Sequence, residues 1–275
     1  MATARGGVHY NKHHQRDCLA MIIRSDGSHL LLITQPDHAA LAGRLMEAWQ
    51  ADDLPVRPTR AVALYATTHH DTGWLEEDAA PRVDPATGWP YDFINMPVLQ
   101  RQAVWTRGVS RLATTSTYVA ALVAQHALTI YRRYRLDPAW TGFMGCMERE
   151  RDHWFMTTRR PDGSSGGALD PPIAGRLGFL QDYTVVRMGD LLSLVFCNRW
   201  TAPEELEGYR IWMDGGDLRI APDPLRGQTV AFEIRARSIL ARRYESDADL
   251  HEALSVASEH ALTGRLVGQE HVPAP

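Results

Sequence analysis

Residues 65–82 read YATTHHDTGWLEEDAAPR, and the stretch places two histidines and an aspartate in a row, directly after an apolar run. Neighbouring side chains on a helix point about 100° apart, so His69, His70 and Asp71 share no packing face. Short side chains at the end of a helix can still converge on one small object, such as a metal ion. Other helices of the fold must then bring the remaining ligands to the same point.

The sequence on both sides of this stretch predicts helices. Residues 58–74, PTRAVALYATTHHDTGW, carry apolar side chains at helical spacing up to the histidines. Residues 35–49, QPDHAALAGRLMEAW, predict another helix, with a proline in its first turn. Further helices are expected at roughly 97–113, 115–135 and 174–200. Residues 158–172, rich in Gly, Ser and Pro, predict a flexible insertion.

Strands are predicted at both ends of the chain. Residues 18–35 predict a β-hairpin that turns at Asp26–Gly27, and residues 205–262 predict short strands followed by a short helix. We therefore expect one domain over residues 1–275. It would be mainly α, with a helical core over 36–200 and a small antiparallel sheet formed by the N-terminal hairpin and the C-terminal strands.

Composition excludes several classes of function. A net charge of −4 over 275 residues gives no electrostatic reason to bind nucleic acid or an anionic membrane. Three well-separated cysteines form no CxxC pair, and no apolar run has membrane-spanning length. We expect a cytoplasmic protein that binds a small molecule. Its oligomeric state stays open, since the tail strands could pair edge to edge in a homo-oligomer.

Ionisable residues interrupt apolar faces on four predicted helices: His38, the His70–Asp71 pair, His126 within YVAALVAQHALTIY, and Asp190 within RMGDLLSLVF. Burial of a lone carboxylate costs several kcal/mol unless it is paired or bound to metal. Each residue also has a structural interpretation, as a hydrogen-bonded core or surface histidine, or as a capping or ion-paired aspartate. Together they favour a metal centre, because helical bundles hold divalent and di-iron centres with mixed histidine and carboxylate ligands.

The order of these residues resembles the H…HD…D signature of the HD superfamily of metal-dependent phosphohydrolases. The chain also resembles a bacterial family catalogued as domain of unknown function 3891. The segments QPDHAALAG, HDTGW and DLLSLVFC carry this resemblance, which covers nearly the whole chain. The first resemblance implies an HD-domain-like helical bundle. It also implies that His38, His70, Asp71 and Asp190 bind metal, with Asp71 placed to bridge two ions.

In this comparison His126 falls where two-metal HD proteins supply extra histidines; His153 is a poor candidate for the second one. One or two divalent transition ions are therefore expected, with Fe, Mn, Zn and Ni all compatible with such ligands. Such an ion lowers the pKa of bound water from about 15.7 toward about 7, and the resulting hydroxide could attack a phosphate ester.

Two further residues receive catalytic roles in this hypothesis. His69 would orient the water or shuttle protons, or else be a solvated residue at a helix end. Arg82 would bind the substrate phosphate through its guanidinium, or else form a salt bridge with Asp78 or Asp84. A metal-dependent hydrolase is the first choice. The alternatives are a di-iron oxygenase of the HD type and a non-catalytic protein that uses the metal site for structure or ligand sensing.

Overall fold

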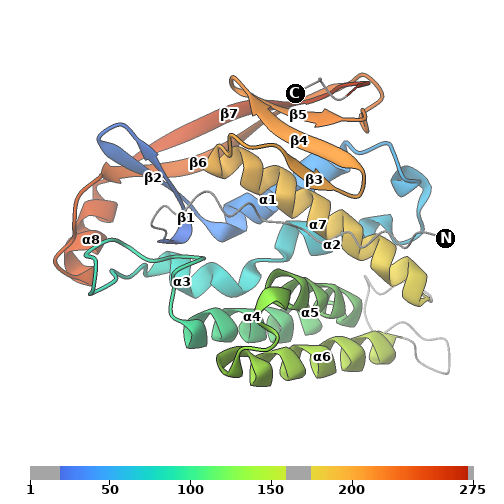
Figure 1. Cartoon of the computed structure of the whole chain (residues 1–275), viewed down its shortest axis with the longest axis horizontal. Helices are drawn as coiled ribbons and strands as arrows, with labels where there is room; N and C mark the ends of the chain where they lie inside the picture. The colour runs from blue at the N-terminus through green and yellow to red at the C-terminus, as the bar shows by residue number, and fades with distance from the viewer. Residues whose placement is uncertain (1–18, 159–174, 272–275) are drawn as a thin grey trace.

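The computed structural model describes residues 19–158 and 175–271, and in this part of the chain seven strands form one sheet above a stack of helices (Figure 1). The strand order is β1-β2-β6-β7-β5-β4-β3. The β5–β7 pair is parallel and the other neighbouring pairs are antiparallel. The strands are β1 (Leu19–Asp26), β2 (His29–Ile33), β3 (Glu204–Leu206), β4 (Tyr209–Asp214), β5 (Asp217–Ala221), β6 (Thr229–Leu240) and β7 (Ser258–Gly268).

The sheet is built on a long ribbon of β6 and β7. These strands pair over ten positions, from Thr229 opposite Val267 to Ser238 opposite Ser258. β2 joins one end of the ribbon along β6, where Leu30 lies opposite Ile239. β5 joins the other end along β7. Strands from the two ends of the chain therefore belong to one extended sheet.

The expectation of a mainly α bundle with a small antiparallel sheet is wrong. The sheet has seven strands, is mixed, and covers one whole side of the helices (Figure 1). The local sequence patterns predicted too small a sheet for two reasons. The pairing of β2 with β6 joins segments about 200 residues apart, and β7 has little apolar alternation because Leu266 is its only fully buried apolar side chain.

Eight α-helices and three short 3₁₀ helices lie in the described part of the chain. α1, α7 and α8 lie against the sheet, and α4, α5 and α6 lie farthest from it (Figure 1). The α-helices are α1 (Gln35–Glu47), α2 (Arg60–His69), α3 (Leu75–Ala79), α4 (Val98–Ala113), α5 (Thr117–Ile130), α6 (Pro138–Thr158), α7 (Arg176–Asn198) and α8 (Asp247–Ser255). The 3₁₀ helices are η1 (Leu54–Val56), η2 (Thr72–Trp74) and η3 (Arg132–Tyr134).

Helix α7 connects the two main apolar cores. Its C-terminal half, including Val195 and Phe196, packs between α1 and the sheet. Its N-terminal half, including Phe179 and Tyr183, packs with α5 and α6. α7 therefore passes from one core to the other, and Asp190 lies in its middle.

Local sequence signals explain where several of these helices begin. The Thr34 hydroxyl accepts a hydrogen bond from Asp37 N–H at the start of α1, and the Ser116 hydroxyl does the same for Val119 N–H in α5. α6 was not anticipated as a separate helix. Apart from Thr158, the predicted insertion near 158–172 lies outside the described residues. None of the described helices combines the length and apolar character that crossing a bilayer requires.

Candidate metal centre

Helices α1, α2 and α7 meet at two glycines. A Cβ atom on Gly43 of α1 would lie 2.0 Å from Thr68 Oγ1, and one on Gly189 of α7 would lie 2.5 Å from Thr67 Cγ2. Both distances are far shorter than van der Waals contact, so a side chain at either position would push the helices apart. The two glycines therefore allow three helices to approach closely at the level of the predicted ligands.

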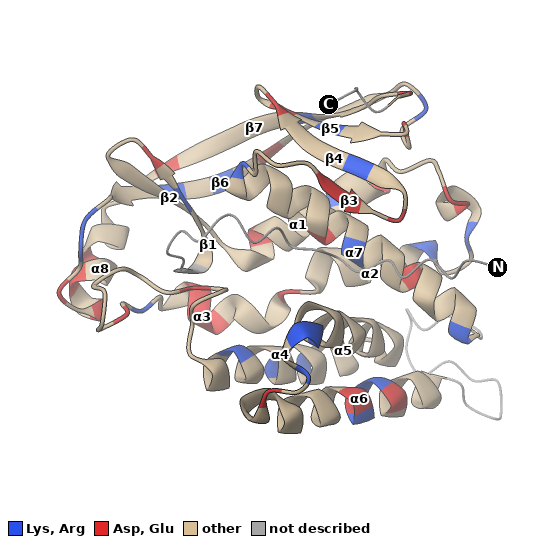
Figure 2. Ribbon diagram, viewed as in Figure 1, with Lys and Arg blue, Asp and Glu red and all other residues tan. Residues whose placement is uncertain are grey.

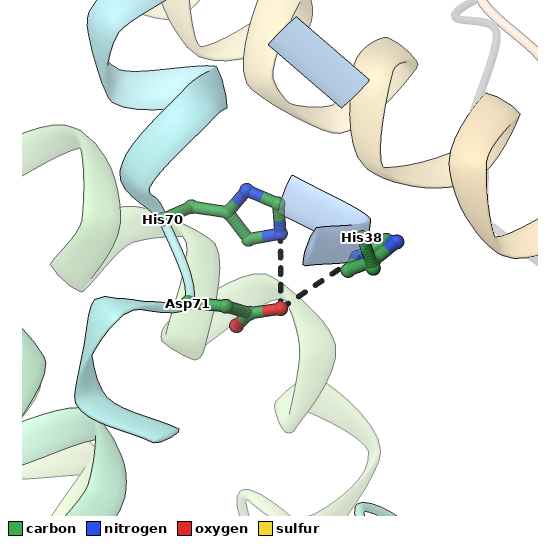
Figure 3. A group of neighbouring side chains, drawn as sticks. All are labelled: His38, His70 and Asp71. Atoms are coloured by element: carbon green, nitrogen blue, oxygen red, sulfur yellow. Dashed lines mark ion pairs between the residues drawn. The ribbon is translucent and has the colours of Figure 1, made fainter. Parts of the chain in front are cut away.

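His38, His70 and Asp71 lie together in this junction. His70 Nε2 is 3.3 Å from Asp71 Oδ2, and His38 Nε2 is 3.6 Å from the same oxygen. Figure 3 shows both rings directed at that oxygen from different sides. The two imidazoles meet edge to face, with ring centroids 5.4 Å apart. The first turn of α1 and the end of α2 thus present three ligand atoms to one point.

Asp190 of α7 joins these three residues to His126 of α5. The five residues together form what we call the cluster. Its Oδ1 is 3.1 Å from His38 Nε2 and 3.5 Å from His70 Nε2. Its Oδ2 is 3.5 Å from His126 Nε2. The structure therefore brings together all five residues that the sequence analysis selected as metal ligands. Asp190, not Asp71, is the carboxylate whose two oxygens face different histidines.

The spacing of these atoms suits ligands around a metal ion. Histidine nitrogens and carboxylate oxygens bind zinc at about 2.0–2.2 Å, so neighbouring ligand atoms in a tetrahedral site lie about 3.4 Å apart. Four distances between a histidine nitrogen and a carboxylate oxygen fall between 3.1 and 3.6 Å. They join the residues His38, His70, Asp71 and Asp190. Two overlapping groups could hold an ion: His38, His70 and Asp71; and His70, His126 and Asp190.

The hydrogen bond at the other nitrogen fixes the tautomer of His70. Its Nδ1 lies 2.7 Å from the carbonyl oxygen of Thr67, and a carbonyl can only accept a hydrogen bond. Nδ1 therefore carries the hydrogen, and in the neutral ring Nε2 presents a lone pair to the cluster. Nε2 of His70 and Nε2 of His126 are both buried without a hydrogen-bond partner among the described residues. Unpartnered buried nitrogens of this kind are suited to a metal ion.

Burial and mutual charge shape the protonation of the cluster. Burial lowers the pKa of His70, but the carboxylates of Asp71 and Asp190 outweigh it and raise that pKa well above its ordinary value. Burial lowers the pKa of His126 to about 4, with only partial compensation by Asp190. Burial would raise the pKa of Asp190, yet its histidine partners hold that pKa far below its ordinary value. Asp190 therefore stays ionised at neutral pH and offers negative charge to a cation.

Arginines of α4 hold the turn that follows Asp71. Arg107 donates two hydrogen bonds to the carbonyl oxygen of Gly73, and Arg111 donates one to that of Thr72. Both arginines also form ion pairs with Glu76, so the acidic residues of α3 lie against the basic residues of α4 (Figure 2). η2 is therefore fastened to α4, and this fixes the backbone on the C-terminal side of Asp71.

His69 and Arg82, the two residues predicted to be catalytic, do not belong to the cluster. His69 is half-buried, with its ring centroid 4.2 Å from that of Tyr65. Burial, and then the charge of His70, lowers the pKa of His69. Arg82 forms a salt bridge with Glu77 at 3.2 Å, rather than with either of the aspartates considered from the sequence. Neither residue is placed against a cluster ligand by a hydrogen bond or ion pair among the described residues.

Sequence reasoning missed the groups that orient the histidines. Ser193 Oγ lies 2.7 Å from His38 Nδ1, and Tyr183 Oη lies 3.4 Å from His126 Nδ1. Both residues are on α7, where Ser193 follows Asp190 by three positions and so lies on the same face of the helix. That spacing was the available signal for Ser193. The role of the Thr67 carbonyl could not be found in this way, because every residue has a backbone carbonyl and the sequence does not distinguish this one.

Comparison with known proteins gives a family but no characterised relative. No curated protein and no solved structure matches the chain. A family described as a protein of unknown function (DUF3891) matches residues 21–240, a range that includes every residue of the cluster. The resemblance to this family is thus confirmed, whereas the HD-superfamily resemblance stays a prediction. The chain belongs to the DUF3891 family.

Proposed function

We propose that the cluster holds a divalent transition metal ion and that the protein is a metal-dependent hydrolase of phosphate esters. What supports the metal is the set of four nitrogen–oxygen separations of 3.1–3.6 Å among His38, His70, Asp71 and Asp190. Nε2 of His70 adds to it, because this buried nitrogen makes no hydrogen bond and faces two carboxylate oxygens at 3.3 and 3.5 Å, an arrangement that a cation would complete.

The residues of the chain would divide the work at such a centre. Two carboxylates would balance the charge of a divalent ion, and the histidines would supply neutral nitrogen donors. All five cluster residues are at most 6% exposed, so only a small part of the ligand set is open to bulk water. When bound, the ion supplies a water ligand whose pKa falls from about 15.7 toward about 7.

Two further residues are proposed to handle water and substrate. His69 adjoins a ligand in the chain and is proposed to orient water or carry protons. Arg82 is proposed to bind the phosphate of a small-molecule substrate, for which it would exchange its salt bridge with Glu77 for one with the substrate. Its guanidinium can form two parallel hydrogen bonds with phosphate oxygens, which would also orient the ester.

A second candidate function is favoured by the position of His126. Its Nε2 lies nearest Asp190 Oδ2, whereas His38 and His70 lie nearest Asp190 Oδ1, so a second ion could share that carboxylate. A centre with two iron ions would favour an oxygenase that uses O₂ over a hydrolase.

Elemental analysis of protein purified without a metal-affinity tag tests the metal. We expect about one or two equivalents of a transition metal per chain, lost in His70→Ala and Asp71→Ala. His153→Ala is the matched control, because this histidine is exposed on α6 and lies against Trp154. A wild-type protein without metal after reconstitution, or a His70→Ala variant with full occupancy, contradicts the metal centre.

Hydrolysis of p-nitrophenyl phosphate and bis(p-nitrophenyl) phosphate tests the reaction. We expect activity in the metal-loaded protein that is lost on chelation and restored by the metal. If the metal-loaded protein hydrolyses neither ester, the hydrolase is wrong while the metal centre stands. Two equivalents of iron with consumption of O₂ would support the oxygenase instead.

A further inference from the structure

We propose that Ser193 is a positioning residue that holds His38 in the tautomer a metal ion requires. This inference rests on the proposed metal centre. Ser193 lies on α7, one helical turn after Asp190, and its side chain is completely buried. The same stretch of α7 would thus supply one ligand directly and orient a second ligand on α1.

The hydroxyl of Ser193 makes two contacts with His38, and together they leave one arrangement of hydrogens. Ser193 Oγ is 2.9 Å from the carbonyl oxygen of His38 and donates to it. It is also 2.7 Å from His38 Nδ1. A serine hydroxyl has a single hydrogen, and the carbonyl uses it. Ser193 Oγ must therefore accept a hydrogen bond from Nδ1–H of His38.

This arrangement determines what His38 offers to the cluster. With the hydrogen on Nδ1, the neutral ring turns a lone pair at Nε2 toward Asp190 Oδ1, 3.1 Å away, and toward Asp71 Oδ2, 3.6 Å away. Three acceptor atoms then face one another in a buried space. Such a group needs a positive charge between its atoms, either a metal ion or a proton on Nε2, so the tautomer set by Ser193 makes Nε2 the atom that a metal ion can bind.

Ser193 differs from the groups that orient the other two histidines. His70 is held by a backbone carbonyl, which no substitution removes. His126 is held by the Tyr183 hydroxyl at 3.4 Å, a longer contact. Ser193 is therefore the orienting group with a short hydrogen bond that one substitution can delete while the ligand itself is kept.

Zinc affinity, measured by competition with a chelator, tests the role of Ser193. Residues that orient histidine ligands typically change metal affinity by about 10- to 100-fold when removed, and we expect Ser193→Ala to weaken Zn²⁺ binding by that factor. Thr184→Val is the control on the same helix. Its hydroxyl donates to the carbonyl oxygen of Leu180, not to a histidine. We expect Thr184→Val to change zinc affinity by no more than about twofold.

A double-mutant cycle separates positioning from a general structural effect. If Ser193 acts through His38, then Ser193→Ala adds no further loss of zinc affinity in a His38→Ala background. Equal losses in both backgrounds, or a wild-type affinity in Ser193→Ala, overturn the proposal.

Nitrogen-15 NMR of the imidazoles gives a readout that does not depend on metal. In the metal-free wild-type protein we expect a hydrogen on Nδ1 of His38, with or without a second hydrogen on Nε2, and we expect the neutral ring to lose this preference for Nδ1 in Ser193→Ala. A neutral His38 whose single hydrogen lies on Nε2 in the wild-type protein contradicts the role of Ser193. If the wild-type protein binds no zinc yet His38 shows the Nδ1 tautomer, the metal centre fails while the positioning by Ser193 stands.

Discussion

Gly189 of α7 lies so close to Thr67 of α2 that a Cβ atom at position 189 would come within 2.5 Å of Thr67 Cγ2. On the α1 side, the same atom would lie 3.0 Å from Met46 Cγ and 3.1 Å from the carbonyl oxygen of Ala42. The contact is one residue away from Asp190. The absence of a side chain at this position therefore sets how closely the helices that carry the cluster approach one another.

Gly189→Ala should separate these helices. Overpacking of a core typically costs about 1–3 kcal/mol of stability, and the altered spacing should also weaken zinc binding. Urea unfolding and chelator competition measure the two effects. Gly178→Ala is the control on the same helix, because no atom lies within 4 Å of its added Cβ. That variant should be neutral or stabilised by up to about 1 kcal/mol. Unchanged stability and zinc affinity in Gly189→Ala would contradict this account of the junction.

Asp182→Ala should destabilise the protein without loss of metal. The fully buried carboxylate accepts hydrogen bonds from Tyr118 and Thr59, both at 2.7 Å, and from Arg57 at 3.2 Å. Its removal leaves three donors without their acceptor, and the loss of a buried charge partner costs about 3–5 kcal/mol. Urea unfolding should show this loss, and Thr59→Ala, which removes one of the three donors, should show a smaller one. A stable Asp182→Ala variant would argue against the network.

Asp78→Asn should stabilise the protein increasingly as pH rises. Burial is the largest cause that raises the pKa of Asp78 well above its ordinary value near 3.8, and nearby carboxylates add to it. The folded chain therefore keeps this proton at pH values where the unfolded chain has lost it, so wild-type stability falls as pH rises through that window. Asparagine carries no charge and can still accept the hydrogen bond from Gln35 N–H.

Urea unfolding at about pH 4.5, 6 and 7.5 measures this trend. Asp249→Asn is the control, because hydrogen bonds from Arg242 hold the pKa of that half-buried carboxyl at about 2. Its contribution to stability is lost only as pH falls through that value, so its difference from wild type should be flat over this range. A difference between Asp78→Asn and wild type that is equally flat would refute the burial effect.

Cys197 should resist alkylation in the folded protein. Burial raises the pKa of its thiol to about 12, and the side chain is fully enclosed. Iodoacetamide reacts with the thiolate, so mass spectrometry should find Cys146, which is half-buried, modified before Cys197. Both should react after unfolding in urea. Rapid labelling of Cys197 in the native protein would show that this part of α7 opens readily.

The residues of the cluster could be found from the sequence because they conflict with their surroundings. His126 interrupts an apolar helix, and Asp190 interrupts another, and a buried polar group needs a partner. The hydrogen bonds that orient His38 were harder to predict, because they join α1 to α7 across more than 150 residues.

The sheet could not be predicted at its true size for a related physical reason. The hairpin of β1 and β2 has a local signal, the turn at Asp26–Gly27, whereas the strand that covers its edge lies near the other end of the chain. β7 carries a glycine at position 264, where Phe196 and Phe232 leave no room for a Cβ atom. A glycine within a strand weakens the sequence pattern for the strand.

The pairing of Leu30 in β2 with Ile239 in β6 has a consequence for synthesis. Proteins are made at about 5–20 residues per second, so roughly 10 to 40 s pass between the appearance of the two strands. During that interval the edge of β2, whose sequence is HLLLI, has no partner and can template pairing with other chains. Residues 38 to 190, which contain the whole cluster, emerge earlier and can enclose it before the sheet is complete. On the ribosome, the hairpin of β1 and β2 therefore keeps one open edge until β6 emerges.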